Sequence, residues 1–149
     1  MRTANLAALP GWPLQGWGFV MERVKTYLIP LARVLMASLF IWSAVRSFRN
    51  PGGSAQYMAN AHMPVPHVTV WVVLVFQIIA GLFILFGFQT RCAAAALAIF
   101  CLFTAFAVHL PAGDYGNLVN FYKNLVMAGG FFYVFVCGAG SLSIDAARA

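Results

Sequence analysis

The chain has 149 residues, of which 62% are hydrophobic and only 8% are charged. This composition excludes an ordinary soluble domain, and the length leaves room for one domain of about four membrane spans. The formal charge of +6 comes from nine Lys and Arg against three acids, with no basic cluster or basic helix. The excess therefore favours contact with anionic membrane lipids and argues against a nucleic-acid partner.

Residues 1–26 are expected to form an arm that lies on the membrane surface ahead of the first span. Pro10 and Pro13 interrupt the place where a signal peptide would carry its apolar core. Trp12 and Trp17 suit anchoring at the membrane interface. The same aromatic side chains could equally dock a partner subunit, and the sequence does not separate these two interpretations.

Residues 27–149 are predicted to form an all-α integral membrane domain, a bundle of four transmembrane helices. Residues 68–88 carry no charge and one strongly polar side chain, Gln77, and would make about 30 Å of helix, the thickness of the apolar part of a bilayer. The other spans are expected at about 27–48, 92–111 and 119–139. Pro30 should fall in the first turn of its helix. The loop at 49–67 has room for a short helix over 54–61.

The orientation follows from the basic residues at the expected helix ends. More Lys and Arg lie on the side of the two termini than on the opposite side. The positive-inside rule therefore predicts both termini in the cytoplasm of a bacterium, with the bundle in its inner membrane.

Arg33 is the most informative polar residue, because it lies about two turns inside the first expected span. An arginine at the centre of a membrane helix costs about 2.5–3.5 kcal/mol on insertion scales. Its long side chain can extend to the headgroups. Alternatively, it faces the interior of the bundle and holds a carboxylate, a quinone carbonyl or a lipid headgroup.

A polar cluster opens the fourth expected span. Asn120, Lys123 and Asn124 are spaced so that they largely share one helical face, and His109 ends the third span at the same surface. An interfacial lysine with capping asparagines would explain part of this pattern. We expect instead an inward polar face that meets a partner group. The residues proposed to contact a quinone or lipid headgroup are thus Arg33, Gln77, His109, Asn120, Lys123 and Asn124.

The loop before the second span contains Met58, His62, Met63 and His67, which are side-chain types that suit copper(I). Pro64 and Pro66 prevent the two histidines from sharing a helical face, so no metal site is predicted. The sequence also contains no pair of intramembrane haem ligands, no flavin or phosphate-binding motif and no nucleophile–base pair. No catalytic residue is therefore predicted.

Five segments in order resemble the DoxX family of small four-helix membrane proteins. They are LARVLMASLFIWSAV (31–45), YMANAHMPVP (57–66), QIIAGLFILFGFQTR (77–91), NFYKNLVMAGGFF (120–132) and GAGSLSID (138–145). The resemblance implies association with membrane redox systems, because named relatives are a quinol oxidase subunit and a thiosulfate:quinone oxidoreductase component. The family usually has glutamate at the position of Gln77 and lysine at that of Ser47, so an ionisable pair is absent here.

These observations favour an accessory, non-catalytic subunit of a larger membrane redox or electron-transfer complex. Such a subunit would be surrounded by lipid and packed against other membrane subunits through Trp12, Trp17, Phe131 and Phe135. One alternative is a quinone-reactive oxidoreductase subunit with Arg33, His109 and Lys123 around the headgroup. Another is a small transporter or metal-handling protein that uses the Met and His loop.

Overall fold

The computed structural model describes residues 14–148, and every regular element in that range is helical. The long helices are α1 (Leu14–Arg49), α3 (Pro66–Phe86), α4 (Thr90–Thr104) and α6 (Tyr115–Cys137). A π-helical turn, η2 (Ala105–His109), and α5 (Leu110–Ala112) extend α4. Two short helices, α2 (Pro51–Asn60) and α7 (Ile144–Ala147), complete the fold. The prediction of an all-α protein with four long helices is confirmed.

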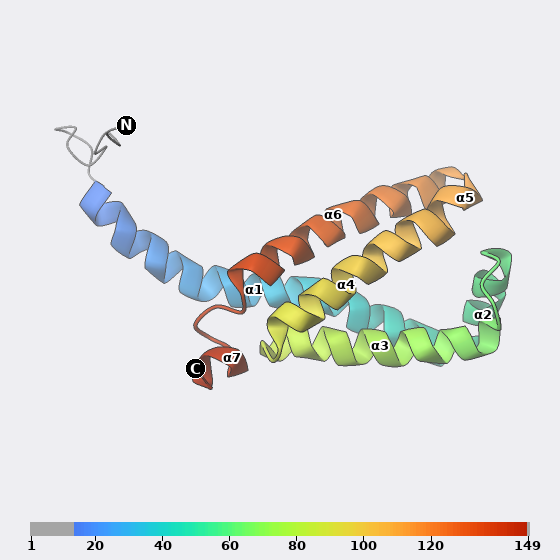
Figure 1. Cartoon of the computed structure of the whole chain (residues 1–149), viewed down its shortest axis with the longest axis horizontal. Coiled ribbons are helices and arrows are strands. Elements are labelled where there is room, and N and C mark those ends of the chain that lie inside the picture. The colour runs from blue at the N-terminus through green and yellow to red at the C-terminus, as the bar shows by residue number, and fades with distance from the viewer. Residues whose placement is uncertain (1–13, 149) are drawn as a thin grey trace, which may run out of the picture.

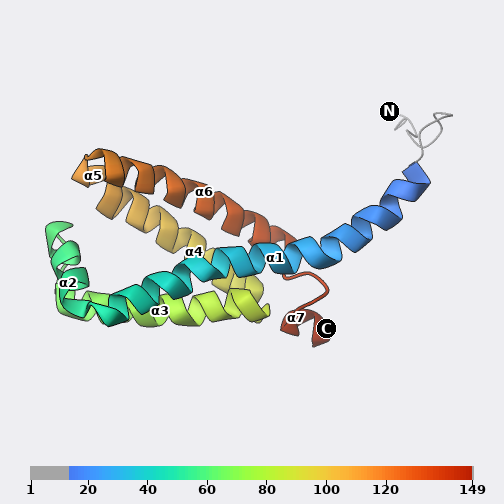
Figure 2. The same ribbon diagram turned by 180° about the vertical axis from the view of Figure 1, so that it is seen from behind.

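The long helices form two pairs. Helix α1 packs along α3, and α4 packs along α6, while a tight turn connects α3 to α4. Figures 1 and 2 show that the two pairs meet at the end that carries α7 and separate towards the end that carries α2 and α5. These two ends of the bundle are called the α7 end and the α2 end below.

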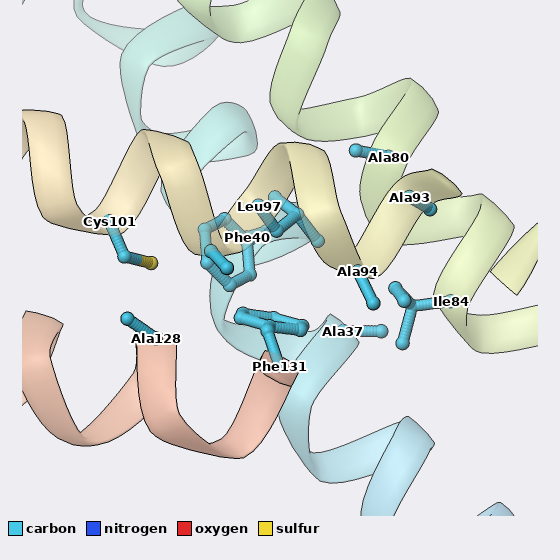
Figure 3. Close-up of a cluster of buried hydrophobic side chains, with 11 residues drawn as sticks. Ala37, Phe40, Ala80, Ile84, Ala93, Ala94, Leu97, Cys101, Ala128 and Phe131 are labelled. Carbon is cyan, nitrogen blue, oxygen red and sulfur yellow. The ribbon is translucent and has the colours of Figure 1, made fainter. Parts of the chain in front are cut away.

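The core lies where the two helix pairs meet, and it is rich in small side chains (Figure 3). Ala37, Ala80 and Ala128 allow close contact between the backbones of α1, α3 and α6 and their neighbours. The Phe40 and Phe131 rings pack edge to face, with their centroids 5.5 Å apart. Close packing of small residues around a few large rings therefore holds the two pairs together.

The expected role of Phe131 in partner contact is wrong, because this side chain is 0% exposed in the core. Phe131 is three residues from Ala128 and seven from Asn124, so all three lie on the buried face of α6. Phe135 is exposed and stays a candidate for partner contact. Trp12 lies outside the described residues, and Trp17 belongs to the first turns of α1.

Three helical stretches are long and apolar enough to cross a membrane: Glu22–Arg49, Pro66–Phe86 and Thr90–Ala112. Helix α6 corresponds to the fourth predicted span, and its 23 residues give about 35 Å of helix. Asn117, Asn120, Lys123 and Asn124 make its first half polar. The second half of α6 is apolar and packs on α4 in the core.

Helix α1 differs from the prediction in where it begins. It starts at Leu14, so residues 14–26 continue the first span as helix and no element boundary occurs at residue 26. Pro30 is consequently inside the helix and not in its first turn. An internal proline removes one backbone hydrogen bond and bends a helix, and α1 is visibly bent (Figure 1). Helix α2 was predicted to begin at residue 54, and it begins at Pro51.

Candidate functional site

The C-terminal segment folds back onto the α3–α4 turn at the α7 end. The Asp145 carboxylate accepts hydrogen bonds from the backbone N–H of Gln89 (2.8 Å), the N–H of Thr90 (2.9 Å) and the Thr90 hydroxyl (2.7 Å). The N–H of Asp145 in turn donates to the carbonyl of Gly87 (2.9 Å). Asp145 therefore caps α4, where unpaired N–H groups and the helix dipole favour a negative charge.

Two opposing effects determine the pKa of Asp145. Partial burial raises it, but the hydrogen bonds from Thr90 and Gln89 and the nearby charge of Arg148 outweigh burial and hold the pKa below its usual range. The guanidinium of Arg148 also lies 4.8 Å from the centre of the Phe88 ring. The carboxylate is thus stabilised in its ionised form.

Arg33 lies beneath this segment and is only 3% exposed. Its Nη2 donates to the carbonyl of Leu142, whereas Nε and Nη1 are buried without a hydrogen-bond partner among the described residues. The guanidinium lies against Gly87: a Cβ built at this glycine would be 1.8 Å from Arg33 Nη1. Arg33 therefore faces the interior, as the second interpretation expected, and its observed partner is a backbone carbonyl of the C-terminal segment.

A second polar group lies at the α2 end. His109 Nδ1 is 3.0 Å from Asn117 Oδ1, and the Tyr57 hydroxyl is 3.3 Å from both of these atoms. The Asn117 side-chain amide donates to the carboxylate of Asp114, which also accepts the backbone N–H of Asn117 (2.9 Å) and so caps α6. Burial, with a smaller contribution from the charge of Asp114, raises the pKa of Tyr57. Tyr57 thereby connects α2 to η2 and α6, and the sequence had given no sign of this role.

Asn124 forms a third polar contact, inside the bundle. It is buried, its side-chain carbonyl accepts the Thr104 hydroxyl (3.2 Å), and its amide donates to the carbonyl of Asn120 (2.9 Å). This contact joins α4 to α6. Asn120 itself is half-buried, and Gln77 is buried within α3.

Lys123 does not join this inward face. Its side chain is exposed and makes no hydrogen bond or ion pair within residues 14–148. One residue corresponds to about 100° around a helix, so the neighbour of a buried Asn124 can point outwards. The expectation that Lys123 faces the bundle interior is wrong, while its alternative, a partner group outside the chain, stays a prediction.

The predicted headgroup residues lie in two separate places. Arg33 is at the α7 end, next to Gly87 and Leu142, whereas His109 is at the α2 end, next to Tyr57 and Asn117. One quinone headgroup could not contact both. Lys123 is also displaced from the level of His109, because it lies six residues, or about 9 Å, beyond Asn117 along α6.

The loop with Met58, His62, Met63 and His67 gives no metal geometry. Both histidines are exposed, and the two methionines are half-buried. Within the described part of the chain, no group of three or more His, Cys, Asp and Glu side chains is placed to hold a metal ion.

Comparison with known proteins places these features in a family context. The family model described as DoxX matches residues 28–110. The chain is 37% identical to "Inner membrane protein YqjF" of Escherichia coli (strain K12), over 84% of this chain and 95% of that protein. It is 30% identical to "Inner membrane protein YphA" of the same organism, over 85% of this chain and 94% of that protein. No solved structure matches the chain.

Proposed function

Because the chain belongs to the DoxX family of membrane proteins, we propose that it is an accessory subunit of a larger complex in the bacterial inner membrane. It acts by assembly, and it carries out no reaction of its own. The redox or electron-transfer character of that complex rests on the family resemblance. The proposal draws its structural support from one outer surface of α6.

This surface is a stripe of exposed residues on the side of α6 that faces away from the core. Tyr122, Val126, Gly129 and Tyr133 recur at spacings of four, three and four residues, so they lie in line along the helix. Val126 is 76% exposed and Tyr133 is 71% exposed. We call these four residues the α6 contact face.

The open space next to Gly129 is the observation that carries the proposal. A Cβ built at this position would meet no atom within 4 Å, so the glycine leaves an open notch between exposed side chains. Glycine weakens a helix by about 1 kcal/mol relative to alanine and gains nothing from contact with lipid. A second helix benefits from such a notch, because close approach of the two backbones increases their dispersion contacts. The α6 contact face therefore suits a protein helix better than lipid.

The inward polar groups support the same interpretation. Asn124 bonds to Thr104, Asp145 to Thr90, and Arg33 to the carbonyl of Leu142. Each of these bonds joins separate segments of the chain, as expected of contacts that stabilise the bundle. The inward polar side chains thus link helices within the bundle, which is a structural role.

Substitution of the notch residue tests the proposal. Gly129→Leu should remove partner subunits that otherwise co-purify after extraction in mild detergent, as measured by native mass spectrometry. Gly52→Leu is the matched control, because Gly52 also has nothing within 4 Å of a Cβ and belongs to α2, outside the α6 contact face. Both substitutions should leave the bundle folded, since leucine is the better helix former.

Two outcomes would overturn the proposal. One is that the extracted chain carries no other protein subunit at natural expression levels. The other is that the isolated chain turns over a quinol, which would replace assembly by the quinone-reactive alternative.

A further inference from the structure

Lys123 is an exposed charged group on α6, the helix that corresponds to the fourth predicted span. It lies eight residues, or about 12 Å, from the start of α6 at Tyr115. Its side chain is exposed, and no described residue pairs with it. A lone ammonium in hydrocarbon is unfavourable, and intramembrane lysines usually pair with an acidic group or a carbonyl. An acidic group or a carbonyl from outside this chain would therefore stabilise Lys123 at this position.

The carboxylates of this chain are already engaged. The sequence contains three acids: Glu22 pairs with Lys25 at 2.7 Å, Asp114 caps α6, and Asp145 caps α4. A second copy of the chain could offer an acid to Lys123 only by giving up one of these contacts. The proposal therefore assigns the complementary charge to a different protein, and capture of a peptide of this same chain in the experiment below would contradict it.

The surroundings of Lys123 show where that protein would lie. Gly130 follows Lys123 by seven residues, close to two full turns, so the two share one side of α6. A Cβ at Gly130 would be 3.3 Å from the Cε of Met36 in α1. Lys123 thus lies at the edge of the α6 contact face that borders α1, and it belongs to the half of α6 nearer the α2 end, where α1 and α6 separate (Figures 1 and 2).

From these observations we infer that the partner presents a transmembrane helix with an Asp or Glu that pairs with Lys123. The helix packs beside Val126 and Gly129. Its carboxylate lies at the level of Lys123, which is about 9 Å from Gly129 along α6 towards the α2 end and about a third of a turn away around the helix. This inference rests on the proposed function, and it adds the chemistry of the partner and its register.

The experiment uses a photo-crosslinking amino acid at Val126, on the α6 contact face, in cells that express the full chain at its natural level. The captured peptide is identified by mass spectrometry. It should come from a membrane helix that contains Asp or Glu. Lys123→Gln should lower the crosslink yield at least about tenfold, whereas Lys123→Arg, which keeps the charge, should retain most of it.

A matched control and a rescue make the test specific. Arg46→Gln removes another exposed cation, one that lies over the Trp42 ring near the end of α1, and should leave the yield unchanged. Lys123→Glu should abolish the crosslink, and exchange of the partner's acid for lysine should restore it.

The possible failures are distinguishable. A captured helix without an acid, or a yield that Lys123→Gln does not change, would overturn the inference and leave the accessory role intact. The second of these results is what a lysine that extends to lipid headgroups would give. If no protein is captured at Val126, both the inference and the α6 contact face fall.

Discussion

At the scale of single residues, Asp145 connects two parts of the sequence that are far apart. The segments that end in Gln89–Thr90–Arg91 and in Ser143–Ile144–Asp145 are separate pieces of the family resemblance, and the structure brings them into contact. The carboxylate satisfies the first N–H groups of α4, and Arg33 holds the carbonyl of Leu142 from below. Gly87 fits between them because any side chain there would overlap the guanidinium.

The Asp145 cap predicts a specific pH dependence. Since its pKa is lower in the folded chain than in the unfolded one, its contribution to stability is complete above the ordinary aspartate pKa of about 3.9 and is lost as the pH falls through the folded value. Asp145→Ala should cost about 1 kcal/mol near neutral pH, as for other helix caps. It should also flatten the loss of thermal stability as the pH falls below about 4, measured in detergent.

Asp114 supplies the comparison for this prediction. Its pKa is also lowered, by hydrogen bonds from Asn117, so the Asp145 variant should keep part of its acid sensitivity. An acid unfolding curve identical to that of the parent chain would show that the Asp145 bonds add nothing to the folded state.

At the scale of elements, hydropathy located the long helices because apolar length is a direct physical requirement of a membrane span. It failed for Phe131, since core and lipid are both apolar and a helix that is apolar on all sides gives no sign of which face is buried. It also missed the early start of α1, because residues 14–26 carry prolines nearby and no regular apolar period. The sequence indicated that polar side chains point inwards, but not which groups they contact. Asn124 was expected to point inwards, whereas nothing in the local sequence reveals its hydrogen bond with Thr104.

Helix α2 offers a test of a contact that the sequence did not reveal. Tyr57→Phe removes the hydroxyl that lies between His109 and Asn117, and one such hydrogen bond contributes about 1 kcal/mol. Backbone amides of residues 51–60 should then exchange with deuterium several-fold faster, while amides of α3 and α4 should be unaffected. Tyr115→Phe is the control, because Tyr115 is the exposed first residue of α6. Unchanged exchange in α2 would mean that packing on α3 alone positions this helix.

At the scale of the whole molecule, the two ends of the bundle have different structures. The α7 end is closed by the C-terminal segment over Arg33, whereas at the α2 end the helix pairs separate and Tyr57 links them (Figure 1). The candidate headgroup site failed as a single site for this reason, because Arg33 contacts the C-terminal segment at the α7 end and His109 contacts Tyr57 at the α2 end. The α6 contact face extends along both halves of α6, whereas Lys123 lies in the half nearer the open α2 end.

The placement of these ends in the membrane gives the last prediction. The excess of basic residues on the side of the termini predicts that the α7 end is cytoplasmic and the α2 end is periplasmic. Cys92 and Cys137 are exposed and would react with thiol reagents, so the test needs a background with the three native cysteines replaced. In that background, Gly113→Cys at the α2 end should react with a membrane-impermeant maleimide in intact cells, and Ala146→Cys in α7 should react only after permeabilisation. Reaction of both from the same side would contradict the arrangement, because the bundle separates these positions by the length of a spanning helix. Reaction with the two sides exchanged would keep the four-helix bundle and reverse its orientation, which would place Lys123 near the cytoplasmic surface and its partner's carboxylate with it.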